Sequence, residues 1–299
     1  MTDRARVAHV DEPSEYALLD LGDGRQLARL GPLVVERPFP AATGAVADPA
    51  AWATADLRYE RPDFGGFGHW IAAAGEPPDA WTMGHAGLTF ELRPTPSGQV
   101  GFFGEQTEPW QWLRESVGRA PAGLRPLPVL NLFAYTGGST LAAAAAGASV
   151  THVDASRPAV AWARRNADLS GLGGAPIRWI VDEAVSFVGR EARRGRRYHG
   201  IVLDPPGYGH GPQGERWTLD GHLPLLLDAT LAIAAEPGFV LLTAHAEGMR
   251  PEDIGDGLAD AFERAGRRRD TARIQVGTLE LRAASGATAP AGVYARWRA

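Results

Sequence analysis

The chain has 299 residues and a mass of 31.8 kDa, which predicts one large α/β domain or a core domain with an appendage. Hydrophobic residues make up 44% of the chain and charged residues 22%, so global disorder and a coiled coil are excluded. There is no cysteine, and all 30 basic residues are arginine, which excludes disulfides, cysteine-ligated metal sites, thiolate nucleophiles, Schiff-base lysines and P-loop lysines.

The formal net charge of −5 is divided unevenly along the chain. Residues 1–120 hold 10 Arg against 17 Asp and Glu, whereas residues 121–299 hold 20 against 18. This distribution argues against a nucleic-acid affinity that depends on one large basic surface. Five arginines do cluster, and we interpret them as a solvated helix end: Arg190, Arg193, Arg194, Arg196 and Arg197.

No stretch approaches the roughly 18 apolar residues of a membrane span. The apolar run Leu223–Ala235 is interrupted by Asp228 and stops at Glu236-Pro237. The first residues lack the basic start and the apolar run of a signal peptide. We therefore expect a cytoplasmic protein without membrane contacts.

Residues 1–120 predict a small, strand-rich appendage that acts as a substrate or lid domain. Strand-like runs at Leu27–Val35, Gly87–Leu92 and Gln99–Phe103 are separated by turns and by segments rich in proline and glycine. Five tryptophans in this region are expected to be packing residues, with a binding platform as the alternative: Trp52, Trp70, Trp81, Trp110 and Trp112.

A regular alternation of strands and helices begins after Pro121 and defines a second domain, residues 121–299. This order predicts right-handed crossovers and a doubly wound parallel sheet covered on both faces. Two final strands joined by a Gly/Ala loop predict an antiparallel hairpin at the sheet edge. The expected strands are Pro128–Leu132, Ser149–Val153, Ile177–Val181, Gly200–Leu203, Phe239–Leu242, Ala272–Leu281 and Val293–Trp297, and the expected helices are Ser139–Ala146, Pro158–Ser170, Glu183–Arg194, His222–Ala235 and Glu252–Ala265.

The loop from Asn131 to Ser139 is the first candidate binding site, because ligands of open α/β sheets lie beyond the carboxyl ends of the strands. Gly137 and Gly138 allow the backbone to approach a ligand, and Ser139 can cap the following helix. The G-x-G-x-x-G pattern of dinucleotide enzymes is absent, so a pyrophosphate is not indicated. The loop predicts a cofactor site, although an ordinary strand-to-helix turn also requires a glycine.

Acidic residues follow the next two strands. Asp154 lies where the carboxylate of nucleotide-binding α/β folds accepts hydrogen bonds from ribose hydroxyls. Asp182 can accept from an adenine amino group or cap the next helix, and the sequence leaves both roles open.

The fourth strand ends in Asp204-Pro205-Pro206. The two prolines stiffen the segment and lack the N–H groups that would extend the sheet, so Asp204 is expected to be held rigidly at the mouth of the sheet. The glycine-rich segment after them predicts a loop that closes over a substrate.

Together these segments resemble a class I S-adenosylmethionine (SAM)-dependent methyltransferase. The chain is most similar to the bacterial large-subunit ribosomal RNA methyltransferases of the cytosine carbon-5 type, over about Gln99 to Gly248. The resemblance implies a Rossmann-like, seven-stranded sheet whose last two strands form the hairpin, with SAM as cofactor and S-adenosylhomocysteine as product. It rests on Asn131-Leu132-Phe133-Ala134-Tyr135-Thr136-Gly137-Gly138, Val153-Asp154-Ala155-Ser156, Arg164-Arg165-Asn166, Asp182, Leu203-Asp204-Pro205-Pro206 and Gly101-Phe102-Phe103-Gly104-Glu105-Gln106.

The acceptor half of the chain departs from that group. The cysteine that attacks the pyrimidine is absent, and the fifth strand continues into Thr243-Ala244-His245-Ala246-Glu247. The group's lysine after Asp-Pro-Pro is Gly207 here, its arginine after Asp-Gln is Thr107, and residues 1–98 do not resemble its RNA-binding PUA domain. We therefore expect methyl transfer to a nitrogen or oxygen atom.

The resemblance and the loop positions together give the candidate site. Asp204 is expected to orient the acceptor, and His210, His245 and Glu105 are candidate general bases, with a surface or capping role as the alternative for each. No metal site is predicted. The expected cofactor-binding residues are Asn131, Phe133, Tyr135, Thr136, Gly137, Asp154, Ala155, Asp182, Glu183, Asp204, Pro205 and Gln106.

Three functions remain open at this point. The resemblance favours a base in structured RNA as the acceptor, whereas the acidic residues 1–120 and the missing PUA domain favour a small metabolite or natural product. A non-catalytic cofactor-binding subunit is the third alternative, and the intact carboxylates at the strand ends argue against it.

Overall fold

The computed structural model describes residues 15–61, 68–210 and 216–299 and divides the chain into two compact units. Unit 1 consists of residues 1–102 together with residues 282–287, and unit 2 consists of residues 103–281 and 288–299. The change between the units thus falls at Phe102/Phe103, whereas the sequence pattern changes near Pro121. The roles assigned to the two regions stay predictions.

Unit 1 contains a five-stranded sheet with the strand order β1-β2-β3-β4-β5. Turns at positive φ, such as those at Gly24 and Gly31, connect the first three strands into a meander. The elements are β1 (Tyr16–Gly22), β2 (Arg25–Leu30), β3 (Leu33–Pro38), α1 (Pro49–Trp52), β4 (Leu57–Glu60) and β5 (His69–Ala72), followed by a separate hairpin of β6 (Trp81–His85) and β7 (Leu88–Leu92).

A buried carboxylate organises one end of unit 1. Asp20 is fully buried and accepts hydrogen bonds from the indole N–H of Trp52, at 2.7 Å, and from the hydroxyl of Ser285, at 2.6 Å. The backbone amides of Leu21, Ala47 and Asp48 also donate to it. Burial by itself raises the pKa of Asp20, but these hydrogen bonds outweigh it and lower the pKa to about 2.

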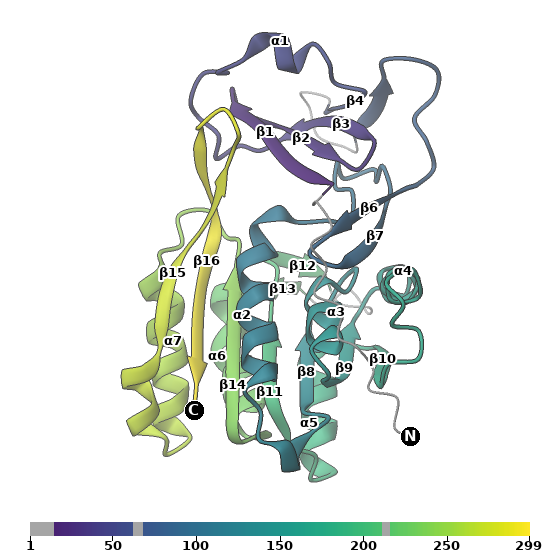
Figure 1. Cartoon of the computed structure of the whole chain (residues 1–299). Coiled ribbons are helices and arrows are strands. Elements are labelled where there is room, and N and C mark those ends of the chain that lie inside the picture. Colours follow the sequence, from purple (N-terminus) through teal and green to yellow (C-terminus); the bar gives the residue numbers. More distant parts are fainter. Residues whose placement is uncertain (1–14, 62–67, 211–215) are drawn as a thin grey trace. The chain divides into compact units, whose positions relative to one another are not determined.

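Unit 2 is built on a seven-stranded sheet with the order β10-β9-β8-β11-β14-β16-β15 (Figure 1). The five strands from β10 to β14 are parallel, and β16 runs antiparallel to β14. The predicted α/β sheet of seven strands, with its last two at one edge, is confirmed. The strands are β8 (Pro128–Leu132), β9 (Ser149–Asp154), β10 (Ile177–Val181), β11 (Tyr198–Leu203), β14 (Ala234–Ala244), β15 (Gln275–Arg282) and β16 (Thr288–Arg298).

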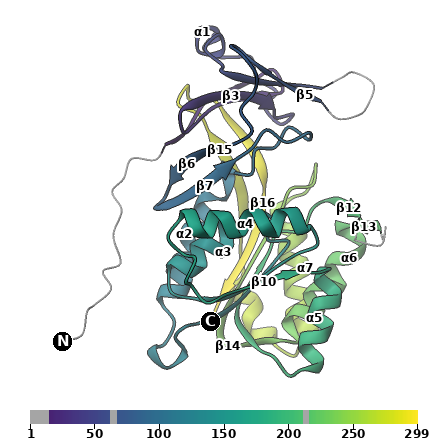
Figure 2. The ribbon, with the colours of Figure 1, turned by 90° about the vertical axis from the view of Figure 1, so that its right-hand side faces the viewer.

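Helices cover both faces of this sheet (Figures 1 and 2). One face carries α2, α3 and α4, and the other carries α5, α6 and α7, as expected for right-handed crossovers on both sides. A short hairpin of β12 (Tyr208–His210) and β13 (Arg216–Thr218) precedes α6. The helices are α2 (Thr107–Gly118), α3 (Gly138–Ala145), α4 (Arg157–Leu169), α5 (Ala184–Arg193), α6 (Leu219–Leu231) and α7 (Pro251–Arg264), with short 3-10 segments η1 (Gly104–Gln106), η2 (Ala122–Leu124) and η3 (Arg268–Arg273).

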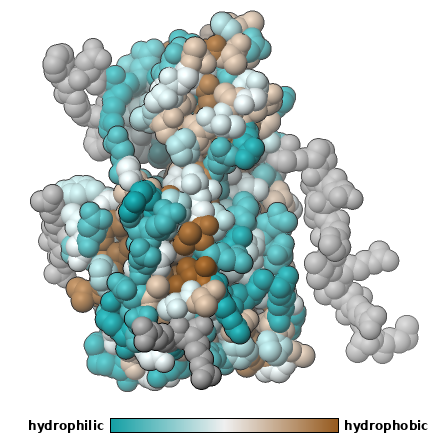
Figure 3. All heavy atoms as spheres, turned by 90° about the vertical axis from the view of Figure 1, so that its left-hand side faces the viewer, coloured by the Kyte–Doolittle hydropathy of each residue, from teal (hydrophilic) through white to brown (hydrophobic). Residues whose placement is uncertain are grey.

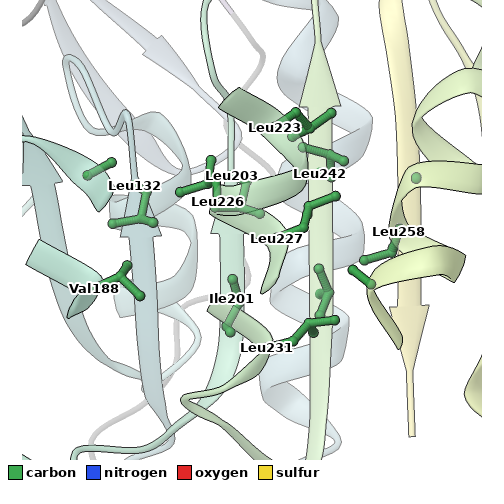
Figure 4. Close-up of a cluster of buried hydrophobic side chains, with 14 of the residues drawn as sticks. Leu132, Val188, Ile201, Leu203, Leu223, Leu226, Leu227, Leu231, Leu242 and Leu258 are labelled. Carbon is green, nitrogen blue, oxygen red and sulfur yellow. The ribbon is translucent and has the colours of Figure 1, made fainter. Parts of the chain in front are cut away.

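The core of unit 2 lies between the sheet and the second helical layer. Figure 4 shows leucines of α6 pointing toward β11 and β14, where Leu226 and Leu227 meet Ile201 and Leu242. Leu258 of α7 extends the same cluster. Burying side chains of this size stabilises the fold by roughly 1.5 to 3 kcal/mol each, so this layer holds the strand ends in place.

The outer surface carries few large hydrophobic groups. Figure 3 shows the side of the molecule on which α7 and β15 lie, where hydrophilic residues predominate and hydrophobic ones form small patches. Val276 of β15 is one of six large hydrophobic side chains that are exposed in the described residues. None of the helices that the structure describes is long and apolar enough to span a membrane.

Several predicted elements were wrong in position. The predicted strand Gln99–Phe103 is irregular, because turn and loop hydrogen bonds such as Arg93 N–H to Val100 O replace a sheet ladder. The run Leu27–Val35 is two strands separated by the turn at Gly31. The predicted helix His222–Ala235 ends at Leu231, and residues 272–274 lie in or directly after η3. Helix α2 was not predicted at all.

Candidate active site

The loop between β8 and α3 has an unusual backbone. Phe133 and Tyr135 have φ values of 55° and 45°, a left-handed region that side-chain-bearing residues rarely occupy, and Gly137 has a φ of 92°. The Asn166 side chain donates to the carbonyl of Thr136 at 2.9 Å, and the Gly137 N–H donates to Ala134 O. These hydrogen bonds thus hold a strained loop in one conformation, as is common at functional sites.

Asp154 fixes this loop to the end of β9. One carboxylate oxygen accepts from the Tyr135 N–H at 2.8 Å, and the other accepts from the Ser156 N–H at 2.8 Å. Burial raises the pKa of Asp154, and these two hydrogen bonds offset part of that increase. A carboxylate has about four acceptor sites, so two remain for further donors.

Two glycines let other backbone and side-chain groups approach the loop. A Cβ atom on Gly137 would lie 3.0 Å from the Cβ of Ala163 in α4, and one on Gly138 would lie 2.2 Å from the Trp110 ring. The Tyr135 ring lies between Phe103 and Trp162, with centroids 5.8 and 6.2 Å away. Side chains of α2, of α4 and of the segment before η1 therefore pack closely against the loop.

Asn131 and Glu183, both predicted to bind the cofactor, make structural contacts. Asn131 is buried and donates to the Thr140 hydroxyl at 2.9 Å. Glu183 caps α5, because its carboxylate accepts from the N–H groups of Val185 and Ser186. The capping role considered for Asp182 thus belongs to its neighbour. Asp182 instead forms an ion pair with Arg190 and lies half-buried at the end of β10.

Asp204 lies directly after β11 and has three side-chain partners. Its Oδ1 accepts from the Thr243 hydroxyl at 2.7 Å and lies 3.1 Å from Nε2 of His245. Its Oδ2 accepts from the Gln106 amide at 3.2 Å. Burial by itself raises the pKa of Asp204, but the charge of His245 and the hydrogen bonds from His245 and Thr243 outweigh it and lower the pKa. Asp204 is therefore an ionised group with one oxygen that still has acceptor capacity.

The surroundings of His245 favour a doubly protonated ring. Its Nδ1 lies 2.7 Å from the carbonyl of Ala291, which can only accept, so Nδ1 carries a proton. Its Nε2 lies 3.1 Å from the Asp204 carboxylate, which also only accepts, and 3.2 Å from the side-chain nitrogen of Gln106, so a proton on Nε2 is donated to Asp204. Burial lowers the pKa of His245, but the charge and hydrogen bond of Asp204, with help from Glu105 and Ala291, raise it to about 9. These contacts argue against the prediction that His245 is a general base.

The remaining predicted residues lie around this pair. Gln106, in η1, is buried beside Asp204, and Glu105 next to it is half-buried and close enough for its charge to act on His245. Pro205 is buried, whereas Ala155 is exposed after β9. The backbone of His210 lies in β12, but its side chain falls outside the described residues.

Three residues of the site were missed by the sequence reasoning. Thr243 holds Asp204, Asn166 holds the cofactor loop, and Trp217 donates from its indole N–H to the carbonyl of Pro206 at 2.8 Å. The Trp217 ring also lies 5.1 Å from the Phe133 ring. Thr243 could have been found, because it is the first residue of the segment that follows the predicted fifth strand, where the cysteine of the methyltransferases that the sequence resembles is absent. The described residues contain no group of three or more metal-binding side chains.

Comparison with known proteins assigns the family. Residues 41–226, more than half of the chain, match the family model of S-adenosylmethionine-dependent methyltransferases. This chain belongs to that family. The crystal structure of a SAM-dependent methyltransferase from Agrobacterium tumefaciens is similar over 97% of this chain and 92% of that one, with 35% identity and a TM-score of 0.87. A protein of Streptococcus mutans described as a SAM-dependent methyltransferase shares the fold, with 17% identity and a TM-score of 0.74 over 96% of this chain and 75% of that one.

Two curated relatives of this methyltransferase are named for ribosomal RNA. Ribosomal RNA large subunit methyltransferase I of Aeromonas salmonicida is 31% identical over 171 residues, which cover 56% of this chain and 41% of the relative. Ribosomal RNA large subunit methyltransferase K/L of Allochromatium vinosum is 34% identical over 164 residues, which cover 51% and 21%. The chain thus spans less than half the length of these relatives.

The geometry at the strand ends fits the SAM that the family uses. Asp154 has acceptor capacity left for ribose hydroxyls, and the Phe133–Gly137 loop lies beside it, joined to it by the Tyr135 N–H. Asp204 follows β11, which pairs with β8, and β8 in turn pairs with β9. The predicted cofactor residues and the predicted acceptor-orienting residue therefore lie at the ends of three adjacent strands of one unit.

Proposed function

We propose that this methyltransferase transfers the methyl group of SAM to a nitrogen or oxygen atom of a base in ribosomal RNA, with Asp204 orienting the acceptor. The observation that carries the proposal is the Asp204–His245 ion pair, which keeps an ionised carboxylate at the strand end in a chain that has no cysteine. Covalent activation of a pyrimidine by a thiolate is excluded. An acceptor atom with its own lone pair needs no such activation.

Each residue then has a defined task. Bound SAM supplies an electrophilic methyl group on a positively charged sulfur. Asp154 and the loop held by Asn166 bind and orient the cofactor. Asp204 Oδ2 accepts a hydrogen bond from the N–H or O–H of the acceptor, which directs the acceptor's lone pair toward the methyl carbon and stabilises the positive charge that develops on it. Alignment of this kind can contribute roughly 7 to 11 kcal/mol.

The proton of the acceptor leaves after alignment has been achieved. Because the pKa of Asp204 is lowered, this carboxylate acts mainly through position and charge. A nitrogen that has received a methyl cation is acidic, so water can remove its proton. The ion pair with His245 and the hydrogen bond from Thr243 keep Asp204 in the ionised form that this role requires.

RNA is the acceptor that the relatives support. Both curated relatives carry names for large-subunit ribosomal RNA. The family match over residues 41–226 includes Asp154 and Asp204. No described feature favours a small molecule, apart from the acidic residues 1–120 noted in the sequence. We therefore treat a small-molecule acceptor as an outcome of the test.

The test uses SAM labelled in its methyl group. The purified protein is incubated with ribosomal RNA from cells that lack this methyltransferase and, separately, with a small-molecule extract of the same cells. We expect label in the RNA, and nuclease digestion should locate it on a nitrogen or oxygen atom of one nucleoside. The Asp204→Asn variant serves as the control, since it keeps the side-chain shape. Label only in the extract, or on carbon 5 of a pyrimidine, would contradict the proposal.

A further inference from the structure

A second pocket lies at the opposite end of the unit 2 sheet from Asp154 and Asp204. It has a volume of about 140 Å³ and is formed where α2 ends, β8 and β14 begin, and β16 ends (Figure 1). Its lining includes Ser116, Arg119, Leu127, Pro237, Phe239 and Arg298. Phe239 precedes Thr243 by four residues of one strand, or roughly 13 Å. The pocket is therefore separate from the candidate active site.

The two arginines of this pocket lack a carboxylate partner. Arg119 and Arg298 take part in no ion pair with the residues that the structure describes, and Arg298 donates to the Ser116 hydroxyl at 3.3 Å. Burial and the nearby charge of Arg119 lower the pKa of Arg298, whereas the exposed Glu115 acts in the opposite direction. Two like charges thus line one cavity, and the Glu115 carboxylate that acts on Arg298 does so without a direct ion pair among the described residues.

Neighbouring arginines differ in this respect. Arg125 donates to the carbonyl oxygens of Gly118 and Ala120 at the end of α2, and Arg296 pairs with Glu108 at 2.6 Å. Their positive charges are satisfied within the fold. Arg119 and Arg298 are left with N–H groups that can bind an external anion.

A basic edge continues from the pocket. His199 hydrogen-bonds through Nδ1 to the carbonyl of Pro237, which lines the pocket, at 2.6 Å. Arg196 and Arg197 directly precede β11, are exposed, and form no ion pair with described residues. Arg196 and Arg197 therefore add positive charge at the end of the sheet where the pocket lies.

We propose that this pocket binds a phosphate group, with the guanidinium groups of Arg119 and Arg298 as its two ligands. Planar guanidinium groups match the oxygen geometry of phosphate and bind it through paired N–H groups. The phosphate belongs either to an RNA backbone that continues over Arg196 and Arg197 or to a free phosphate. The site is distinct from the proposed methyl transfer and does not depend on it.

Binding without turnover tests the site. Calorimetry measures inorganic phosphate and, separately, a 20-nucleotide RNA oligonucleotide against wild type, Arg119→Gln, Arg298→Gln and Arg264→Gln. Arg264, on the exposed side of α7 and paired with Asp228, is the matched control. We expect phosphate affinity to fall at least tenfold in both pocket variants and to stay unchanged in the control.

The RNA arm distinguishes the two sources of phosphate. An RNA affinity that falls at least fivefold in the pocket variants, with a salt slope reduced by roughly 0.7 for each lost phosphate contact, assigns the pocket to RNA. Loss of phosphate binding with unchanged RNA affinity assigns it to free phosphate. Equal phosphate affinity in wild type and Arg119→Gln would overturn the proposal. Because Arg119 is exposed, we expect the Arg119→Gln variant to fold normally.

Discussion

At the scale of single residues, the chemistry depends on how Asp204 is held. Its carboxylate is fixed by Thr243 at the end of β14, by His245 directly after it and by Gln106 of η1. Each of these groups donates a hydrogen bond and none competes as an acceptor. The carboxylate therefore stays ionised in one orientation, which suits a group that aligns an acceptor.

Replacing Asp204 by Asn should affect the chemical step more than cofactor binding. The amide keeps the shape but loses the charge and adds an N–H donor where Thr243, His245 and Gln106 already donate, so we expect single-turnover rates to fall about 10²-fold or more. Cofactor affinity should change by less than about tenfold, because Asp154 and its loop are the residues proposed to bind the cofactor. Normal turnover would remove Asp204 from the site, and lost cofactor binding would make it a binding residue.

His245 should titrate far above an ordinary histidine. Its pKa in the folded chain is about 9, so it contributes stability that is complete below pH 6.5 and is lost as the pH rises through about 9. NMR of the ring nitrogens measures this, and comparison with His245→Gln assigns the signal among the eight histidines. In Asp204→Asn the pKa of His245 should fall, since burial is then opposed only by the smaller contributions of Glu105 and Ala291. A wild-type signal that titrates at or below 6.5 would restore His245 as a candidate base.

Asp154→Ala should weaken SAM binding. If one charge-assisted hydrogen bond to the cofactor is lost, affinity falls by about 1.5 to 3 kcal/mol, and loosening of the Tyr135 amide adds to the effect. Calorimetry with S-adenosylhomocysteine measures the change. Asp168→Ala, on the far end of α4, is the control and should bind normally. An unchanged affinity of Asp154→Ala would contradict the assignment.

Sequence reasoning could find the carboxylates of this site, and it named Gln106 and His245 as site residues, but it could not show that these two side chains contact Asp204. Asp154 and Asp204 follow apolar strand runs, and the strand-end rule for α/β sheets then brings them to one edge. The protonation state of Asp204 and His245 could not be deduced in the same way, because it depends on tertiary contacts. That His245 meets the Ala291 carbonyl depends on β16 pairing with β14, a contact between residues 46 positions apart.

At the scale of elements, the role of the loop between β8 and α3 in cofactor binding can be tested with two glycines that have the same φ. Gly137 and Gly147 both have a φ of 92°, but a Cβ at Gly137 meets Ala163 at 3.0 Å, whereas one at Gly147 meets nothing within 4 Å. Replacing either by Ala should cost about 1 to 2 kcal/mol of stability. Only Gly137→Ala should also weaken SAM binding, as measured by calorimetry and thermal unfolding. Equal cofactor affinity in both variants would remove the loop from the site.

Elements with strong periodicity were predicted well, and elements fixed by tertiary contacts were not. The strands Pro128–Leu132 and Ile177–Val181 match the prediction, because apolar runs between turn residues are typical of buried parallel strands. Helix α2 was missed because Trp110 and Trp112 were interpreted as packing residues of the first domain. Helix α2 is stabilised by packing against α3, where Trp110 donates to Ser139, and this tertiary contact cannot be predicted from the local sequence.

At the scale of the whole molecule, the net negative charge resides in unit 1. Unit 1 holds 9 Arg against 14 Asp and Glu, and unit 2 holds 21 against 21. A molecule with no large cationic excess can bind RNA only through local clusters, which limits the number of phosphates it neutralises.

Salt dependence therefore separates RNA from a small acceptor. If ribosomal RNA is the acceptor, the logarithm of its affinity should fall with the logarithm of salt concentration, with a slope of roughly −1.5 to −3 for a few neutralised phosphates. Turnover of a small acceptor should be nearly constant over the same range. Filter binding and initial rates at low and moderate salt measure the two quantities, and a flat RNA curve would favour the small acceptor.

The Ser285 hydrogen bond to Asp20 joins residues 265 positions apart within unit 1. During synthesis from the N-terminus, the strands around Asp20 emerge from the ribosome long before Ser285 does. Until then, the carboxylate lacks one of its five donors and the unit lacks its residues 282–287. Completion of unit 1 therefore has to wait until nearly the whole of unit 2 has been translated.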